Sequence, residues 1–139
     1  MSVEALFRPF DLGKVHLPSR VVMAPMTRNF SPSGVPGANV AAYYGKRAEH
    51  GVGLIITEGM AIAHPSANGY RDVPRLDPSL PREGLAGIVA AAHAHGVPVF
   101  PQLWHVGSIR KAAREANPDV PSSAPSAVGH PAYGDRGPV

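Results

Sequence analysis

Cysteine is absent from the 139 residues of this sequence. That absence excludes disulfides, cysteine-ligated zinc and a thiol nucleophile. No apolar run approaches the ~20 residues that a membrane-spanning helix needs. The start, Met1-Ser2-Val3-Glu4, lacks the basic flank and apolar stretch of a secretory signal. We therefore expect a cytoplasmic protein with no membrane partner.

Concentrated charge is also missing. Charged residues make up 17% of the chain, the formal net charge is +3, and lysine and arginine are scattered without a block of five or more. A nucleic-acid partner is therefore not expected. The sequence contains no glycine-rich phosphate loop of the Rossmann or Walker kind and no repeat at solenoid spacing.

What is present is a core-forming composition with frequent chain breaks: 44% hydrophobic residues, 16 prolines and 15 glycines. The length suits one modest domain. Apolar periodicity and turn residues predict a hairpin over 10–17, centred on Gly13, and helices that Gly51 and Gly96 terminate. The predicted strands cover 20–24, 53–58 and 97–103, the predicted helices cover 39–50 (capped by Asn39) and 81–95, and loops cover 61–77 and 112–139.

Strands that alternate with helices favour right-handed βαβ units and a parallel α/β sheet. We accordingly divide the chain into a hairpin (1–19), the βαβαβ units (20–104) and a loop-rich tail (105–139). The predicted sheet has three parallel strands and two helices, with one unpaired edge on each side.

Candidate ligand-binding residues follow the predicted strands, because ligands bind at the carboxyl ends of parallel strands. The set offers a hydroxyl, a glycine, an amide and an indole, which together suit a planar aromatic ligand with a polar edge. The three strand ends read Pro25-Met26-Thr27-Arg28, Thr57-Glu58-Gly59 and Gln102-Leu103-Trp104-His105.

These residues resemble the Old Yellow Enzyme family of flavin-dependent ene reductases, from about Leu6 to about Val128. The resemblance rests on several short motifs that occur in the right order and at the right spacing. They are Leu6-Phe7-Arg8-Pro9-Phe10, Leu17-Pro18-Ser19-Arg20-Val21, Ala24-Pro25-Met26-Thr27-Arg28, Ile56-Thr57-Glu58-Gly59, Gly69-Tyr70 and Gln102-Leu103-Trp104-His105-Val106-Gly107.

The resemblance implies a (β/α)8 TIM barrel, closed at its bottom by the hairpin, with FMN across the top. Pro25 and Met26 would lie along the flavin, and the Thr27 hydroxyl would reach its O4 edge. Gly59 would allow a close approach of backbone to the ring, and Gln102 would bond its pyrimidine edge. Trp104 would shape the substrate pocket. The implied reaction passes a hydride from NAD(P)H through the flavin to the C=C bond of an enone.

The sequence also departs from the family's pattern. The substrate-binding His–Asn or His–His pair, the proton-donating Tyr and the last two phosphate-binding loops have no match, and a barrel needs roughly 250 residues. Pro101 removes a hydrogen-bond donor from a strand, and Ser108 stands where the family commonly has Arg. We expect no complete catalytic set and no activity from this chain alone, unless another chain supplies the missing strands.

The alternative hypothesis is a non-catalytic half-barrel fragment or assembly module, paired with a complementary barrel fragment or with itself as a homo-oligomer. For Glu58 the sequence favours a structural ion-pair role over that of a catalytic acid. His64, His105 and His130 fall in separate loops without carboxylates at ligand spacing, so no metal site is predicted. Arg110, Lys111 and Arg114, with Glu115, are interpreted as a solvated basic face.

Overall fold

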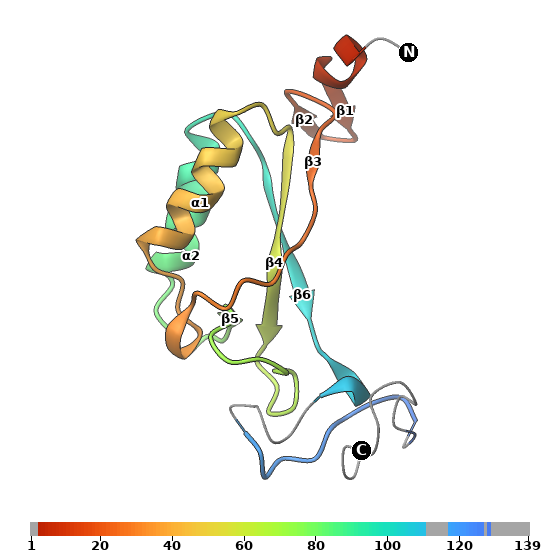
Figure 1. The fold of residues 1–139 in the computed structure, drawn as a ribbon, viewed down its shortest axis with the longest axis vertical. Helices are drawn as coiled ribbons and strands as arrows, with labels where there is room; N and C mark the ends of the chain where they lie inside the picture. The colour runs from red at the N-terminus through yellow and green to blue at the C-terminus, as the bar shows by residue number, and fades with distance from the viewer. Residues whose placement is uncertain (1–2, 111–116, 127, 129–139) are drawn as a thin grey trace.

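The structure is a computed structural model, which describes residues 3–110, 117–126 and 128. A parallel sheet with two helices on one side forms its centre, and a separate hairpin lies at one end (Figure 1). The elements are η1 (Val3–Phe7), β1 (Phe10–Leu12), β2 (Val15–Leu17), β3 (Val22–Met23), η2 (Pro32–Gly34), α1 (Ala38–Glu49), β4 (Leu54–Ile62), β5 (Arg75–Leu76), α2 (Glu83–His93), β6 (Val99–Trp104) and η3 (Gly107–Ile109).

Strand β4 is the central strand of the sheet. It pairs in parallel with β3, β5 and β6. The predicted parallel α/β order is therefore confirmed, and the predicted hairpin is the antiparallel pair β1–β2, turned at Gly13 with φ of +61°. A positive φ suits glycine because it has no Cβ.

Several boundaries differ from the predicted ones. Strand β4 continues to Ile62, and β5 lies inside the predicted 61–77 loop. Two-residue strands such as β5 carry no periodic signal, since only their pairing with β4 defines them. The cap of α1 is Gly37 rather than Asn39, and no side chain bonds the first turn. Helix α2 begins at Glu83, two residues after the predicted start.

Helices α1 and α2 lie side by side on one face of β4 (Figure 1). Small residues allow their close approach, since a Cβ built at Gly45 in α1 would lie 3.2 Å from the Ala91 Cβ in α2. The core between helices and sheet consists of Val40, Tyr44, Ala48, Ile55, Met60, Ile88, Ala92 and Val97. In the part of the chain that the structure describes, no helix has both the length and the apolar character to cross a bilayer.

Candidate functional site

β3 and β6 pair with β4 along opposite edges, and β3 ends beside Ile55, in the first half of β4. Gly59 of β4 is the register partner of Gln102 of β6. On the other side of β4, the main-chain N–H of Arg28 donates to Glu58 Oε2 over 3.2 Å. The residues at the ends of the three predicted strands therefore lie next to one another, with the middle of β4, at Glu58 and Gly59, between the other two segments.

A bulge in β4 shapes its edge toward β6. The register with β6 shifts between Ile56 and Gly59, so Pro101, which has no N–H, lies opposite the bulge. The N–H of Gln102 points instead to the Thr57 hydroxyl, 3.4 Å away, and that hydroxyl donates to the Glu58 carbonyl over 3.0 Å. The bulge thus accommodates the proline that the sequence marked as a departure.

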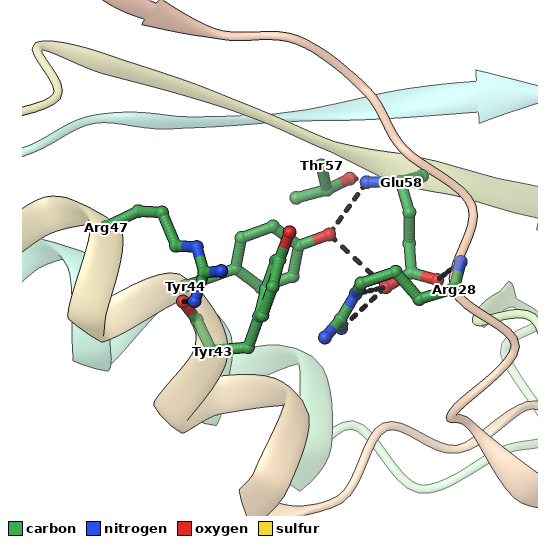
Figure 2. A network of polar contacts seen from close by, with 6 residues as sticks. All are labelled: Arg28, Tyr43, Tyr44, Arg47, Thr57 and Glu58. Atoms are coloured by element: carbon green, nitrogen blue, oxygen red, sulfur yellow. Dashed lines mark hydrogen bonds and ion pairs between the residues drawn. The ribbon is translucent and has the colours of Figure 1, made fainter.

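Glu58 is the centre of a buried polar network, drawn in Figure 2. Its side chain is 1% exposed, and its Oε1 accepts bonds from Arg28 Nε (3.1 Å) and Nη2 (2.8 Å). The Tyr44 hydroxyl accepts the Glu58 N–H over 2.8 Å and donates to Oε1 over 3.3 Å. The predicted role of Glu58 as an ion-pair partner is confirmed.

The Arg28 guanidinium, which bonds to Glu58, also packs against the aromatic ring of Tyr43. Arg28 lies 3.7 Å from the ring centroid of Tyr43, and Arg47 lies 3.6 Å from the same centroid. Figure 2 shows the Tyr43 ring between the two arginines, an arrangement that favours cation–π attraction. Burial raises the pKa of Tyr44 to about 12, and the neighbouring Glu58 charge adds to that rise. Tyr44 is therefore a neutral hydrogen-bonding residue in this network.

Thr27 and Gln102 differ from this saturated centre. Both are half-buried, and within the described residues neither side chain has a hydrogen-bond partner. Pro25 and Met26 are exposed, the latter by 62%. A hydroxyl and an amide thus remain available to a ligand at the edge where the sequence predicted one.

Gly59 and Trp104 pack directly against each other. A Cβ built on Gly59 would lie 2.2 Å from Trp104 Cε3, so only glycine leaves room for the indole ring there. Trp104 also stacks on Tyr70, with centroids 5.2 Å apart and planes at 27°. In this structure the missing side chain of Gly59 accommodates an indole, and its predicted contact with a flavin stays a prediction. In the sequence, Tyr70 is only part of the Gly69-Tyr70 motif, and no pattern predicted its contact with Trp104.

His64 and His105 come together although they lie on different loops. His64 Nδ1 is 3.3 Å from His105 Nε2, and the buried Ser66 hydroxyl is 3.1 Å and 3.4 Å from these two atoms. Burial, His64 and Arg110, in that order, lower the pKa of His105 below its ordinary value. In the described ranges, no three histidine or carboxylate side chains form a metal-binding group. His130 lies outside the described residues.

Arg110 corrects the predicted solvated basic face. It is 1% exposed, and its guanidinium donates to the carbonyl oxygens of Asn68, Asn117 and Val120. Arg110 can be buried because the chain places three carbonyl acceptors around its guanidinium group, which has five N–H donors. Lys111, Arg114 and Glu115 lie outside the described residues.

Comparison with solved structures identifies the architecture. Morphinone reductase is 41% identical and superimposes with a TM-score of 0.80, covering 90% of this chain and 32% of that one. An old yellow enzyme homologue from Zymomonas mobilis is 31% identical with a TM-score of 0.78, covering 96% and 38%. The sheet and its two helices are therefore part of a (β/α)8 TIM barrel, as predicted.

Sequence comparison identifies the family. Residues 5–135 match the NADH:flavin oxidoreductase / NADH oxidase family, and the chain belongs to that family. A putative 12-oxophytodienoate reductase 2 from Oryza sativa subsp. japonica is 39% identical over 119 residues, which are 86% of this chain and 31% of the relative. The chain thus spans about a third of the length of the curated relatives that it matches. The predicted family assignment is confirmed.

Proposed function

We propose that this chain forms part of the FMN-binding wall of an NAD(P)H-dependent ene reductase. One observation carries the proposal: among the described residues, the half-buried side chains of Thr27 and Gln102 have no hydrogen-bond partner, and they belong to the segments on either side of the middle of β4. In the same place, backbone and ion-pair contacts occupy the Thr57 hydroxyl and the Glu58 carboxylate. Free donors and acceptors at the carboxyl end of a parallel sheet are typical of a ligand site.

The donor set fits the flavin that the family implies. Gln102 offers both a donor and an acceptor for the pyrimidine edge, and Thr27 offers a hydroxyl for the O4 position. Pro25 and Met26, which are exposed, would provide apolar surface for the ring, and Trp104 would line the substrate side. Bound FMN would supply the hydride-transfer chemistry that these side chains lack.

The names of the relatives support the choice of substrate and reductant. They are reductases of 12-oxophytodienoate and of morphinone, and one morphinone reductase structure holds tetrahydroNAD. An enone as substrate and NAD(P)H as reductant are therefore the natural proposal for the whole enzyme. By itself the chain is expected to bind FMN weakly and to reduce no enone.

Titration of the full chain with FMN, followed by the absorbance of the flavin, tests the proposal. We expect weak saturable binding and about tenfold weaker binding in both Thr27→Val and Gln102→Ala, which corresponds to one lost hydrogen bond each. Asn39→Ala, which removes an exposed amide from the first turn of α1, is the matched control and should bind like the wild type. Absent saturation in the wild type, or equal affinities in all variants, would contradict the proposal.

The alternative of a complementary or self-paired half-barrel has its own support. Strand β6 pairs only with β4 among the described strands, and its Leu103 and Phe100 are 67% and 39% exposed. Another strand could pair with that edge. Sedimentation velocity distinguishes the two cases: a folded, colourless dimer favours assembly, and a monomer that takes up FMN favours the first proposal.

A further inference from the structure

The chain between β3 and α1 passes the candidate site without a strand ladder. β3 contributes only two register pairs to β4, at Val22 and Met23, and the following residues 24–27 belong to no strand. The next hydrogen bond to the sheet is the one from the Arg28 N–H to the Glu58 carboxylate, at 3.2 Å. The position of Thr27, one residue earlier, therefore depends on that carboxylate.

Glu58 itself is rigidly held. Its main-chain N–H and its Oε1 both contact the hydroxyl of Tyr44, a 1% exposed residue of α1. The β4 bulge turns this part of the strand away from regular pairing with β6. The Glu58 carboxylate is thus held in place both by its strand, β4, and by its contact with helix α1.

The Arg28 side chain provides a second connection to Glu58. Its Nε and Nη2 donate to Oε1 at 3.1 Å and 2.8 Å, and Tyr43 stacks on the guanidinium. Main chain and side chain of Arg28 are therefore both bound to one carboxylate. Four donors surround that carboxylate, three at Oε1 and one at Oε2, and the side chain is 1% exposed, so its contacts are with this chain rather than with solvent.

From this geometry we infer that Glu58 is a positioning residue, which fixes the Pro25–Thr27 segment and through it the Thr27 hydroxyl. Its effect on flavin binding rests on the proposed function, whereas its effect on the segment does not. Glu58 touches neither the cofactor nor the substrate in this scheme. Its action passes through Arg28.

Amide hydrogen exchange of the full chain without FMN tests the positioning. Glu58→Gln keeps the shape but presents an NH2 group to surrounding donors, so we expect the Arg28 amide to exchange at least about tenfold faster, which corresponds to ~1.4 kcal/mol or more of lost protection. The Ile55 amide, bonded to the Pro98 carbonyl at 3.1 Å, reports the sheet and should not change. Glu49→Gln, at an exposed glutamate of α1, is the control.

If hydrogen exchange is accelerated equally at the Arg28 and Ile55 amides, the substitution has lowered stability in general, and the inference is overturned. An unchanged exchange rate at the Arg28 amide would also overturn it. If Glu58→Gln does not fold, Tyr44→Phe replaces it, because it removes one support of the carboxylate and keeps the charge. A smaller acceleration confined to Arg28 and its neighbours is then the supporting result.

A double-mutant cycle with FMN tests the action through Thr27. If Glu58 works by placing that hydroxyl, Glu58→Gln combined with Thr27→Val should bind FMN no more weakly than Glu58→Gln alone. If the two substitutions weaken FMN binding independently, so that their fold-changes multiply, Glu58 does not act through the Thr27 hydroxyl and this part of the inference is overturned. A wild type that binds no FMN refutes the proposed function, while the exchange result at Arg28 still decides whether Glu58 positions the segment.

Discussion

Strands β4 and β6 belong to the same sheet and consist mostly of apolar residues, yet their environments differ. All residues of β4 except Ile56 and Ile62 are buried, and Ile55 is completely so. No residue of β6 is buried, and Leu103 is 67% exposed. An apolar cavity of about 190 Å³ lies between β6, β4 and α2, bordered by Val99 and Pro101.

The difference follows from the number of neighbours. β4 has strands along both edges and helices over one face, while β6 has only β4 beside it among the described strands. The polar groups follow the same division. The Glu58 carboxylate in the middle of β4 accepts four hydrogen bonds, whereas the Gln102 side-chain amide of β6 has no partner within the described residues. We therefore expect β4 to contribute most to stability, and the residues beside it to make the proposed ligand contacts.

The most direct way to break this comparison is to truncate one apolar side chain on each strand. Ile55→Ala should cost about 2–5 kcal/mol of unfolding free energy, because it leaves a cavity in a packed core. Leu103→Ala should change it by less than about 0.5 kcal/mol, since the side chain is largely in water. Urea unfolding measures both, and similar losses would show that the strands are equally packed.

The next largest loss of stability is expected at the contact between Gly59 of β4 and Trp104 of β6. Gly59→Ala places a methyl group against Trp104 and should cost about 1–3 kcal/mol through displacement of the indole. Gly87→Ala in α2 is the control, because its Cβ would lie 3.7 Å from Ala41 and the change should gain up to about 1 kcal/mol. The emission of Trp104, the single tryptophan, should shift only in Gly59→Ala. An unshifted emission would contradict the packing described here.

Removing one hydroxyl tests how much the hydrogen-bond network around Glu58 contributes to stability. Tyr44→Phe leaves the buried Glu58 N–H without an acceptor and should cost about 1 kcal/mol. Tyr43→Phe removes a hydroxyl that has no partner within the described residues and should be neutral. Because the pKa of Tyr44 is raised to about 12 from an ordinary 10.0, wild-type stability should fall as pH rises from 10 to 12. A fall of the same size in Tyr44→Phe would assign it to other groups.

The smallest expected effect is an acid response near the end of β6. Gly107 N–H donates to His105 Nδ1 over 3.1 Å, so the proton of the neutral ring belongs on Nε2, toward His64. The pKa of His105 is lowered, so below its ordinary 6.5 the unfolded chain takes up a proton that the folded chain resists. This part of the stability is complete above pH 6.5 and declines as pH falls.

Unfolding measured between pH 7.5 and about 5 checks this effect. His105→Gln should flatten the decline, while His93→Gln, at an exposed position of α2, should retain it. An identical decline in all three proteins would remove His105 as its source. The arrangement of His64, Ser66 and His105 would then have no role in the acid response.

Local sequence patterns were sufficient to predict the order of the hairpin, the longer strands and the two helices, and also the family. Apolar stripes over Val40 and Tyr44 or Leu85 and Ile88 define the helices, because a 3.6-residue period is a local property. The unbroken apolar run at Leu54–Ile56 marked β4 as a buried strand. The motifs at the three strand ends were sufficient for the family assignment.

Which polar side chains lack a hydrogen-bond partner among the described residues depends on the tertiary structure. Thr57 and Thr27 are both threonines at the ends of predicted strands, yet the Thr57 hydroxyl is bonded at the β4 bulge, while the Thr27 hydroxyl has no partner within the described residues. Arg110 is buried, and His64 meets His105, because the chain folds back over distances of 42 and 41 residues. Such pairings depend on the path of the whole chain, which no local period encodes.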